Sequence, residues 1–267
     1  MISVGKRSAM TIARIAMTLA LPLLAAPAFS QASPGPPKYI LLSEFSVIQS
    51  DSGGWAEAVA MAARAHAKHA DGNLWATYRQ LTGGPDERVR FFFPLNRMGD
   101  LDGWKSNRQV LTEVLGTDRT RMVLADLDLA DRADERVLSF SSKMSRPWPD
   151  FKPPKYAWVE EVRVADGKMV EYAALVERVV RAFNEHGSDG YWVVYGNAIG
   201  GDKSTMIWMY GFEQFAEIDS WESRLDALAK AMPKGEAARL VAAIEAISET
   251  TSGIWQVEPA LSQLERK

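Results

Sequence analysis

Two glutamates, Glu44 and Glu161, lie inside apolar segments of strand length, where a carboxylate could do acid–base chemistry. An unpaired buried charge is costly, so each carboxylate must be ion-paired, solvated or directed into a cavity. In a cavity, desolvation would raise the pKa of the carboxyl group toward the range in which it accepts a proton from a substrate. Arg163 shares a strand face with Glu161 and could pair with it. We keep Glu161 as a candidate catalytic base and Glu44 as a candidate ligand-binding residue, with a structural ion pair as the alternative.

The sequence has three histidines, His66, His69 and His186. His186 comes at the end of a predicted helix, where it could be a general base or an axial haem ligand, or could stabilise the helix end through the dipole. His66 and His69 are spaced i, i+3 and could share a metal ion with Asp71, but their alanine-rich surroundings indicate a solvated helix end. We therefore expect no metal and no cofactor, and keep His186 as the second candidate catalytic residue.

Aromatic residues are dense in the predicted strands. We expect most of them in the core, but Trp and Tyr carry polar tips, and together they could line a cleft for a flat apolar molecule. The sequence contains no nucleophile elbow, P-loop, zinc-protease helix or dinucleotide fingerprint. Besides Glu44, the candidate ligand-binding residues are Trp75, Tyr78, Trp192, Tyr195, Trp208 and Tyr210.

These residues belong to a pattern that occurs twice, 117 positions apart and without gaps. The segment His69–Trp104 recurs as His186–Trp221, and the offset holds from Lys38 to about Phe140. Identities fall at strand starts, hairpin turns and helix caps, where a shared backbone demands particular residues. The sequence predicts the following helices: 55–69, 100–115, 119–133, 167–186, 219–231 and 234–250. The predicted strands are 38–48, 74–79, 89–95, 137–140, 155–164, 190–195, 206–212 and 253–257.

Each half therefore reads as β-α-β-β-α-β, a ferredoxin-like unit with one bare sheet face. Two tandem units could cover each other's bare faces, which predicts an α+β chain that forms an intramolecular α/β barrel. On this basis the chain would be a monomer with an internal pseudo-dimer, or a homodimer. The predicted boundaries are a signal peptide at 1–32, a linker at 33–37, a first unit at 38–145, a Pro/Trp linker at 146–154, a second unit at 155–258 and a tail at 259–267.

The second half resembles a known family in GKMVEYAALVERVVRAFNEHG and in YWVVYGNAIGGDKSTMIWMYGFEQFAEIDSWESRL. These segments are similar to the NIPSNAP-like branch of the dimeric α/β-barrel superfamily. The first half departs from the family pattern at the helix entry, where Gly53-Gly54 replaces Gly167-Lys168. The resemblance implies the fold but no single activity, because the superfamily includes cofactor-free monooxygenases, haem enzymes of the chlorite dismutase and dye-decolourising peroxidase types, lyases and isomerases.

Composition indicates an exported globular protein. The 267 residues carry a net charge of −3 with no basic stripe, so we expect no nucleic-acid partner. Lys6 and Arg7, then an apolar run over 15–26 and small residues, predict a secretory signal peptide cleaved between Ala28 and Ala32. The chain has no cysteine and must fold without disulfides. We expect a secreted protein, in a bacterial periplasm, with no membrane contact after cleavage.

Three functions remain open from the sequence. The first is binding of a small apolar or aromatic molecule between the two sheets. The second is a cofactor-independent monooxygenase or related small-molecule enzyme, with Glu161 or His186 as the base. The third is a protein–protein interaction module that uses the helical surface or a sheet edge.

Overall fold

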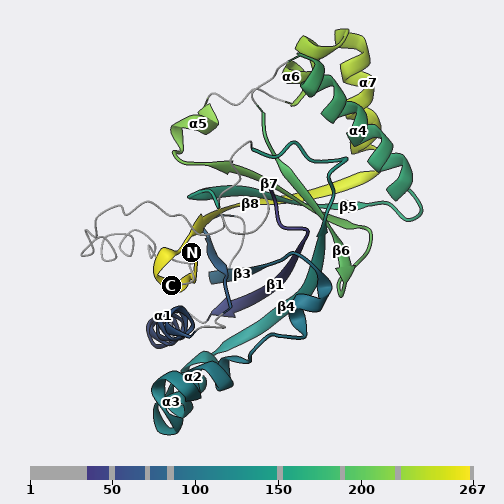
Figure 1. Ribbon diagram of the computed structural model, residues 1–267. Coiled ribbons are helices and arrows are strands. Elements are labelled where there is room, and N and C mark those ends of the chain that lie inside the picture. Colours follow the sequence, from purple (N-terminus) through teal and green to yellow (C-terminus); the bar gives the residue numbers. More distant parts are fainter. Residues whose placement is uncertain are drawn as a thin grey trace, which may run out of the picture.

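The computed structural model describes residues 35–47, 52–69, 73–82, 87–148, 153–186, 190–219 and 224–264 (Figure 1). The predicted signal peptide lies outside these residues, as do Asp71, the hairpin glycines Gly83 and Gly84, and Trp221. Among the described residues, no helix combines the length and the apolar composition that a bilayer span requires.

The first half of the chain contains four strands and the helices between them. The strands are β1 (Tyr39–Val47), β2 (Ala76–Gln80), β3 (Glu87–Leu95) and β4 (Ala130–Phe140). The helices are α1 (Ser52–Lys68), the short 3-10 helix η2 (Met98–Leu101), α2 (Asn107–Leu115) and α3 (Thr117–Leu127).

The second half has the same order of elements. Its strands are β5 (Tyr156–Val164), β6 (Val193–Ile199), β7 (Thr205–Phe212) and β8 (Ser248–Val257). Its helices are α4 (Met169–His186), α5 (Ala216–Asp219), α6 (Arg224–Ala231), α7 (Lys234–Glu245) and the 3-10 helix η3 (Pro259–Leu261).

The eight strands close into one antiparallel barrel in the order β1-β3-β2-β8-β5-β7-β6-β4. The first half contributes β4-β1-β3-β2 and the second half β8-β5-β7-β6, and the halves meet where β2 pairs with β8 and β4 pairs with β6. Closure leaves neither half with an unpaired sheet edge. The molecule is therefore an α+β protein built on an eight-stranded closed barrel, as the alternation of helical and strand periodicity predicts.

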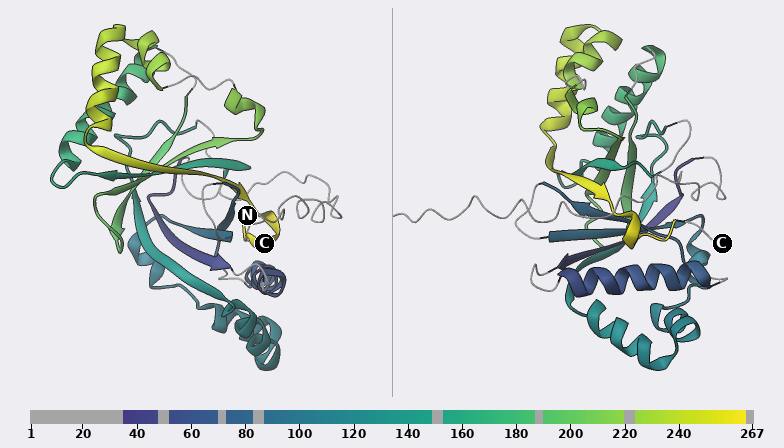
Figure 2. Two further views of the ribbon diagram at one scale, coloured as in Figure 1. Left: turned by 180° about the vertical axis from the view of Figure 1, so that it is seen from behind. Right: turned by 90° about the vertical axis from the view of Figure 1, so that its left-hand side faces the viewer.

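Apart from the short helix α5, the α-helices pack outside the barrel in two groups on opposite sides (Figures 1 and 2). Helices α4, α6 and α7 cover the second half, and their apolar faces meet the outward side chains Trp192 and Trp208. Helix α1 covers the first half around Trp55 and Phe91, with α2 and α3 stacked on its outer side. Each half therefore has one sheet face packed under helices and the other directed into the barrel interior.

The pairings that join the two halves occur twice, 117 positions apart. Tyr78 of β2 lies opposite Val257 of β8, and Tyr195 of β6 lies opposite Phe140 of β4. Both members of the first pair differ by 117 from their counterparts in the second. The two junctions between the halves therefore pair residues at equivalent positions of the sequence repeat.

Two side-chain hydrogen bonds between the halves repeat with the same offset. The indole Nε1 of Trp75 donates to the carbonyl oxygen of Leu261 at 2.8 Å. The indole Nε1 of Trp192 donates to the carbonyl oxygen of Met144 at 2.7 Å. These two bonds also lie 117 positions apart at both ends, so the offset reaches beyond the predicted limit of the repeat near Phe140.

Two predicted helix ends and one helix start are wrong. The helices expected over 119–133 and 234–250 end at Leu127 and Glu245, because β4 and β8 already start at Ala130 and Ser248. Both strand starts pair along β1 and β5, and that pairing overrides the helical pattern of the sequence. The helix expected from residue 100 starts at 107 instead, where Ser106 and Gln109 form a capping box.

Candidate functional site

The barrel interior is divided along its axis into an apolar end and a charged end. Buried apolar side chains next to the charged end belong to the same cluster as the residues of the apolar end, and they include Leu42, Leu138, Val159, Ile207 and Trp255. Alternate residues of every strand point inward, so the same strands supply both ends. The N-terminal parts of β1 and β5 reach the apolar end, and Glu44 and Glu161, farther along these strands, reach the charged end.

The apolar end contains a pocket of about 60 Å³. Two tyrosines, four prolines and aliphatic side chains surround it, so its wall is almost free of polar atoms. The lining residues are Pro37, Ile40, Ala76, Tyr78, Phe92, Pro94, Trp148, Pro153, Pro154, Ala157, Val193, Tyr195 and Met209.

Tyr78 and Tyr195 stand at equivalent places in this pocket. The hydroxyl of Tyr78 donates to the carbonyl oxygen of Pro154 at 3.2 Å, and the hydroxyl of Tyr195 donates to that of Pro37 at 3.1 Å. Each tyrosine therefore holds the segment that leads into the other half. Burial raises the pKa of both phenols above the ordinary value, with a further contribution from the charge of Glu213 at Tyr78. Both phenols stay protonated at neutral pH and act as hydrogen-bond donors.

The linker between the halves forms part of the pocket wall. Gly211 of β7 points inward beside it, and a Cβ atom at Gly211 would lie 2.7 Å from Pro154 and 2.8 Å from the Trp148 ring. A glycine at this position leaves room for the linker to enter the barrel. The sequence predicts this segment only as a linker, because its contact with Gly211 depends on where β7 lies in the folded barrel.

At the charged end, Glu44 is buried and paired with two arginines of the neighbouring strand β3. Its Oε2 atom accepts from Nε of Arg90 at 2.6 Å, and its Oε1 atom accepts from Arg88 at 3.3 Å. The Arg90 guanidinium also lies 4.2 Å from the ring centroid of Trp255, a cation–π contact. Glu44 therefore belongs to a buried structural ion pair.

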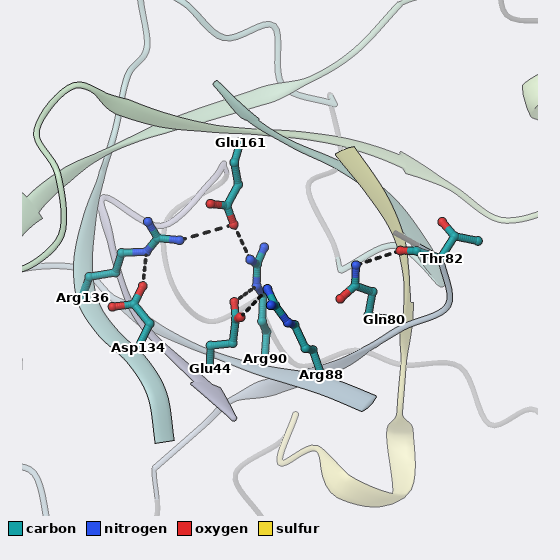
Figure 3. Close-up of polar contacts among 8 residues, drawn as sticks. All are labelled: Glu44, Gln80, Thr82, Arg88, Arg90, Asp134, Arg136 and Glu161. Atoms are coloured by element: carbon teal, nitrogen blue, oxygen red, sulfur yellow. Dashed lines mark hydrogen bonds and ion pairs between the residues drawn. The ribbon is translucent and has the colours of Figure 1, made fainter. Parts of the chain in front are cut away.

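Glu161 reaches across the barrel to arginines of the first half (Figure 3). Its Oε1 atom accepts from Arg90 and, at 3.4 Å, from Arg136, which also pairs with Asp134 at 2.9 Å. Burial acts to raise the pKa of Glu161, but the charges and hydrogen bonds of Arg90 and Arg136 outweigh it, and the pKa lies below its usual value. The predicted partner Arg163 pairs with Asp202 instead, at 3.7 Å. Glu161 is an ionised carboxylate rather than a base with a raised pKa.

Four of the predicted ligand-binding residues lie outside the barrel, between the strands and the helices. Trp75 packs against α1, and Trp192, Trp208 and Tyr210 pack beneath the helices of the second half. The Tyr210 hydroxyl lies 3.4 Å from Glu160. Their positions follow from strand alternation, since they have the opposite parity to the inward residues of the same strands. Of the predicted set, the structure brings only Tyr78 and Tyr195 into the pocket.

The histidines are outside the barrel as well. His186 is exposed at the end of α4. An axial haem ligand must face a cavity, so the surroundings of His186 do not fit a haem site. His66 is buried, with Nε2 3.0 Å from the side chain of Asn107, and burial lowers its pKa to about 4. His69 contacts Glu113 at 2.6 Å. Within the described ranges, no three His, Cys, Asp or Glu side chains gather closely enough to hold a metal ion.

Comparison with known proteins gives structural neighbours only. No protein-family model matches the chain, and no curated protein matches it either. A candidate monooxygenase from Lactobacillus acidophilus is 9% identical over 85% of this chain and 97% of its own, with a TM-score of 0.46. An anthrone oxidase-like protein is 14% identical over 90% of this chain and 100% of its own, with a TM-score of 0.45.

A chlorite dismutase variant from Candidatus Nitrospira defluvii is 13% identical over 85% of this chain and 93% of its own, with a TM-score of 0.43. All three TM-scores lie below 0.5.

Proposed function

We propose that the protein binds a small apolar or aromatic molecule in the apolar end of its barrel. The observation that carries this proposal is the pocket of about 60 Å³ between Tyr78 and Tyr195. Binding of an apolar ligand to an apolar wall is favourable because it removes apolar surface from water, and the shape of the wall selects the ligand. Both hydroxyls already donate to backbone carbonyls, so the part of the ligand that enters needs no polar atom of its own.

The size of the pocket limits what enters it. An enclosed cavity of roughly 150 Å³ can hold benzene. The pocket here is smaller but lies at the barrel mouth, where a ligand can protrude beyond Trp148 and Pro153. We therefore expect the ligand to insert the edge of one ring or a short alkyl group, with the rest outside.

Binding fits the pocket better than catalysis does. Proton abstraction requires a base within hydrogen-bond reach of the substrate. The pocket lining contains no carboxylate or imidazole among the described residues. Glu161 lies at the charged end of the barrel, paired with Arg90, and His186 is exposed on α4.

Filling the pocket tests the proposal. Ala157 lines the pocket, and its counterpart 117 positions earlier is Ile40, so Ala157→Ile introduces a side chain that the fold already accepts in the other half. We expect the substitution to weaken binding of toluene or indole by about tenfold or more, which corresponds to about 1.4 kcal/mol. Ligand-observed NMR on the purified protein measures the affinity.

The matched control is Met209→Leu, which nearly conserves the volume of another lining side chain. We expect this variant to bind within about threefold of the unaltered protein, because leucine and methionine are both apolar and similar in volume, so the shape of the pocket changes little. Equal binding by the Ala157→Ile variant, with its fold intact by circular dichroism, would refute binding in this pocket.

The second candidate function is a cofactor-independent monooxygenase. The feature that would favour it is the pair of protonated phenols beside the pocket, which could stabilise an enolate oxygen if they left their carbonyl partners. Oxygen consumption by the protein with anthrone, lost in a Tyr78→Phe variant, would support this function. No consumption above the buffer rate would leave the binding function alone.

We also propose that the chain consists of two tandem ferredoxin-like units that form an intramolecular pseudo-dimer. The support is that the pairings Tyr78–Val257 and Tyr195–Phe140, and the matching indole hydrogen bonds, repeat with an offset of 117. A place in the NIPSNAP-like branch and export to a periplasm remain proposals that rest on the sequence segments alone.

A further inference from the structure

His66, in the last turn of α1, stands where the second half of the chain has Phe183, 117 positions later. Both side chains are buried, with exposed fractions of 2% and 6%. The His66 ring meets Trp75 edge to face, with ring centroids 5.2 Å apart, and the Phe183 ring meets Trp192 in the same way, also at 5.2 Å. The two rings therefore fill equivalent space, and packing alone does not require an imidazole at this place.

The imidazole makes two hydrogen bonds that a phenyl ring cannot make. The backbone N–H of Asn73 donates to Nδ1 of His66 at 3.1 Å, so Nδ1 carries no proton. In the neutral ring the proton then lies on Nε2, which donates to Oδ1 of Asn107 at 3.0 Å. A proton on Nδ1 would place one donor against another and break the bond to Asn73. His66 therefore satisfies both partners only in its neutral form.

These hydrogen bonds attach α2 to α1. Asn107 is the first residue of α2, and the side-chain amide of Asn73 donates to the carbonyl oxygen of Lys105, just before α2, at 3.1 Å. The apolar part of the same contact consists of Ala58, Ala62 and Ala65 of α1, Val110 and Leu111 of α2, and Val123 of α3. Because α2 and α3 lie on the outer side of α1, they can separate from it while the strands of the barrel stay paired (Figure 1).

The titratable groups that face this contact are His69 of α1, Glu113 of α2 and Lys105. His69 lies 2.6 Å from the Glu113 carboxylate, and Lys105 lies 3.5 Å from it. The hydrogen bond from His69 is the largest cause that holds the pKa of Glu113 below its usual value, so this pair persists when the pH falls moderately. The first group of the contact to respond to acid is therefore expected to be His66.

The direction of the response follows from the pKa of His66. Burial is the largest cause that lowers this pKa from 6.5 to about 4; the Asn107 bond acts against it, and the charge of His69 acts with it. The folded pKa is thus below that of an exposed histidine. The stabilisation by neutral His66 is fully present above pH 6.5 and is lost as the pH falls toward about 4.

We propose that His66 makes the contact between α1 and the α2–α3 pair an acid-sensitive joint. Protonation of its Nδ1 atom releases Asn73, and with it the start of α2, while the barrel stays closed. Phe183 does not titrate, so the helices of the second half stay in place at the same pH. The joint is independent of ligand binding in the apolar pocket.

Amide hydrogen exchange at pH 7 and pH 4, corrected for the intrinsic exchange rate at each pH and read by mass spectrometry, tests the joint. Opening of α2 and α3 should increase roughly 100-fold between these pH values, which follows from the lowered pKa of His66. Peptides of α6 and α7 are the internal reference and should change by less than about threefold. An equal increase in both halves would overturn the proposal, because acid would then loosen the whole molecule.

Two variants assign the effect to His66. His66→Phe introduces the side chain that the second half has at the equivalent place. It removes both hydrogen bonds, so α2 and α3 should exchange faster than in the unaltered protein at pH 7, with no further increase at pH 4. His69→Gln removes the pair with Glu113 but keeps His66, and it should retain the increase. An increase that persists in His66→Phe, or that disappears in His69→Gln, would contradict the assignment.

An NMR titration of the unaltered protein gives a result that does not depend on how well a variant folds. The His66 ring should titrate well below its ordinary pKa of 6.5, and the amide signal of Asn73 should change over the same pH range. Titration of the His66 ring at the ordinary value would overturn the proposal.

Discussion

Arg90 joins the two halves of the barrel electrostatically, together with Arg136. It pairs with Glu44 of its own half and with Glu161 of the other (Figure 3). Its guanidinium also makes a cation–π contact with Trp255. The Arg90 side chain is only 5% exposed, and it shares the neutralisation of the two carboxylates with Arg88 and Arg136. Its counterpart in the second half is Ile207, so this ion pair occurs once in an otherwise repeated structure.

We expect Arg90→Met to destabilise the protein by about 3–5 kcal/mol, because it removes the buried guanidinium that contacts both Glu44 and Glu161. Urea unfolding followed by circular dichroism measures the change. The control is Arg178→Gln, which breaks the exposed pair with Glu236 and should cost no more than about 1 kcal/mol. Similar losses in the two variants would mean that Arg90 contributes no more than a surface charge does.

The pH dependence of stability should report Glu161. Its folded pKa lies below the unfolded value, so the stabilisation is fully present above the unfolded pKa and is lost as pH falls through the folded pKa. Glu161→Gln imitates the protonated state. We therefore expect the difference in unfolding free energy between the variant and the unaltered protein to be largest near neutral pH and to shrink below about pH 4. A difference that stays constant with pH would contradict the ion pair.

The sequence predicted the carboxylates of this cluster but not their partners. Glu44 and Glu161 stand out because a carboxylate within an apolar strand needs compensation. Arg90 and Arg136 resemble ordinary solvated charges in the sequence, and Arg163 was the nearer choice of partner for Glu161. The pairing depends on which strands lie opposite each other in a closed barrel, and a local pattern does not contain that information.

At the scale of elements, the linker between the halves is a structural part of the barrel. Gly211 gives it room, and Trp148 and Pro154 fill the space that a side chain would occupy. The part of the pocket wall that the linker forms therefore depends on Gly211. A glycine inside a strand usually weakens the strand, and it often marks a place where another segment comes close.

Gly211→Ala should destabilise the protein by about 1–3 kcal/mol and weaken ligand binding, since the new methyl group overlaps Pro154 and Trp148. Gly235→Ala is the control, because nothing lies within 4 Å of its Cβ position and alanine favours the helix by up to about 1 kcal/mol. Thermal unfolding separates the two outcomes. An unchanged melting temperature for Gly211→Ala would show that the linker is not packed against β7.

The sequence predicts helices and strands well where the hydrophobic periodicity is strong. It predicts their boundaries poorly where a helix is followed by a strand that begins with polar residues. The strands around Tyr78 and Tyr195 and the helix ending at His186 lie close to where the sequence places them. The first residues of β4 and β8 are polar and read as helix, but pairing with β1 and β5 draws them into the barrel. Tertiary contacts decided these boundaries, and the sequence alone could not show them.

At the scale of the whole molecule, closure of the barrel separates two interior environments. From the sequence we expected aromatic and acidic residues to share one cleft between two sheets. In the closed barrel, the two tyrosines of the pocket and the two glutamates lie at opposite ends of the interior. Strand alternation also sends Trp75, Trp192, Trp208 and Tyr210 beneath the helices. To separate these two groups of residues from the sequence, one must know which alternate residues of each strand point into the barrel.

The central claim is that the apolar end of the barrel receives a small apolar molecule. A crystal of the protein soaked with bromobenzene tests it most directly, because the anomalous signal of bromine marks the ligand position. We predict a bromine peak within van der Waals distance of Tyr78, Tyr195 and Trp148. An unoccupied pocket, or bromine bound only among the outer helices, would contradict the claim.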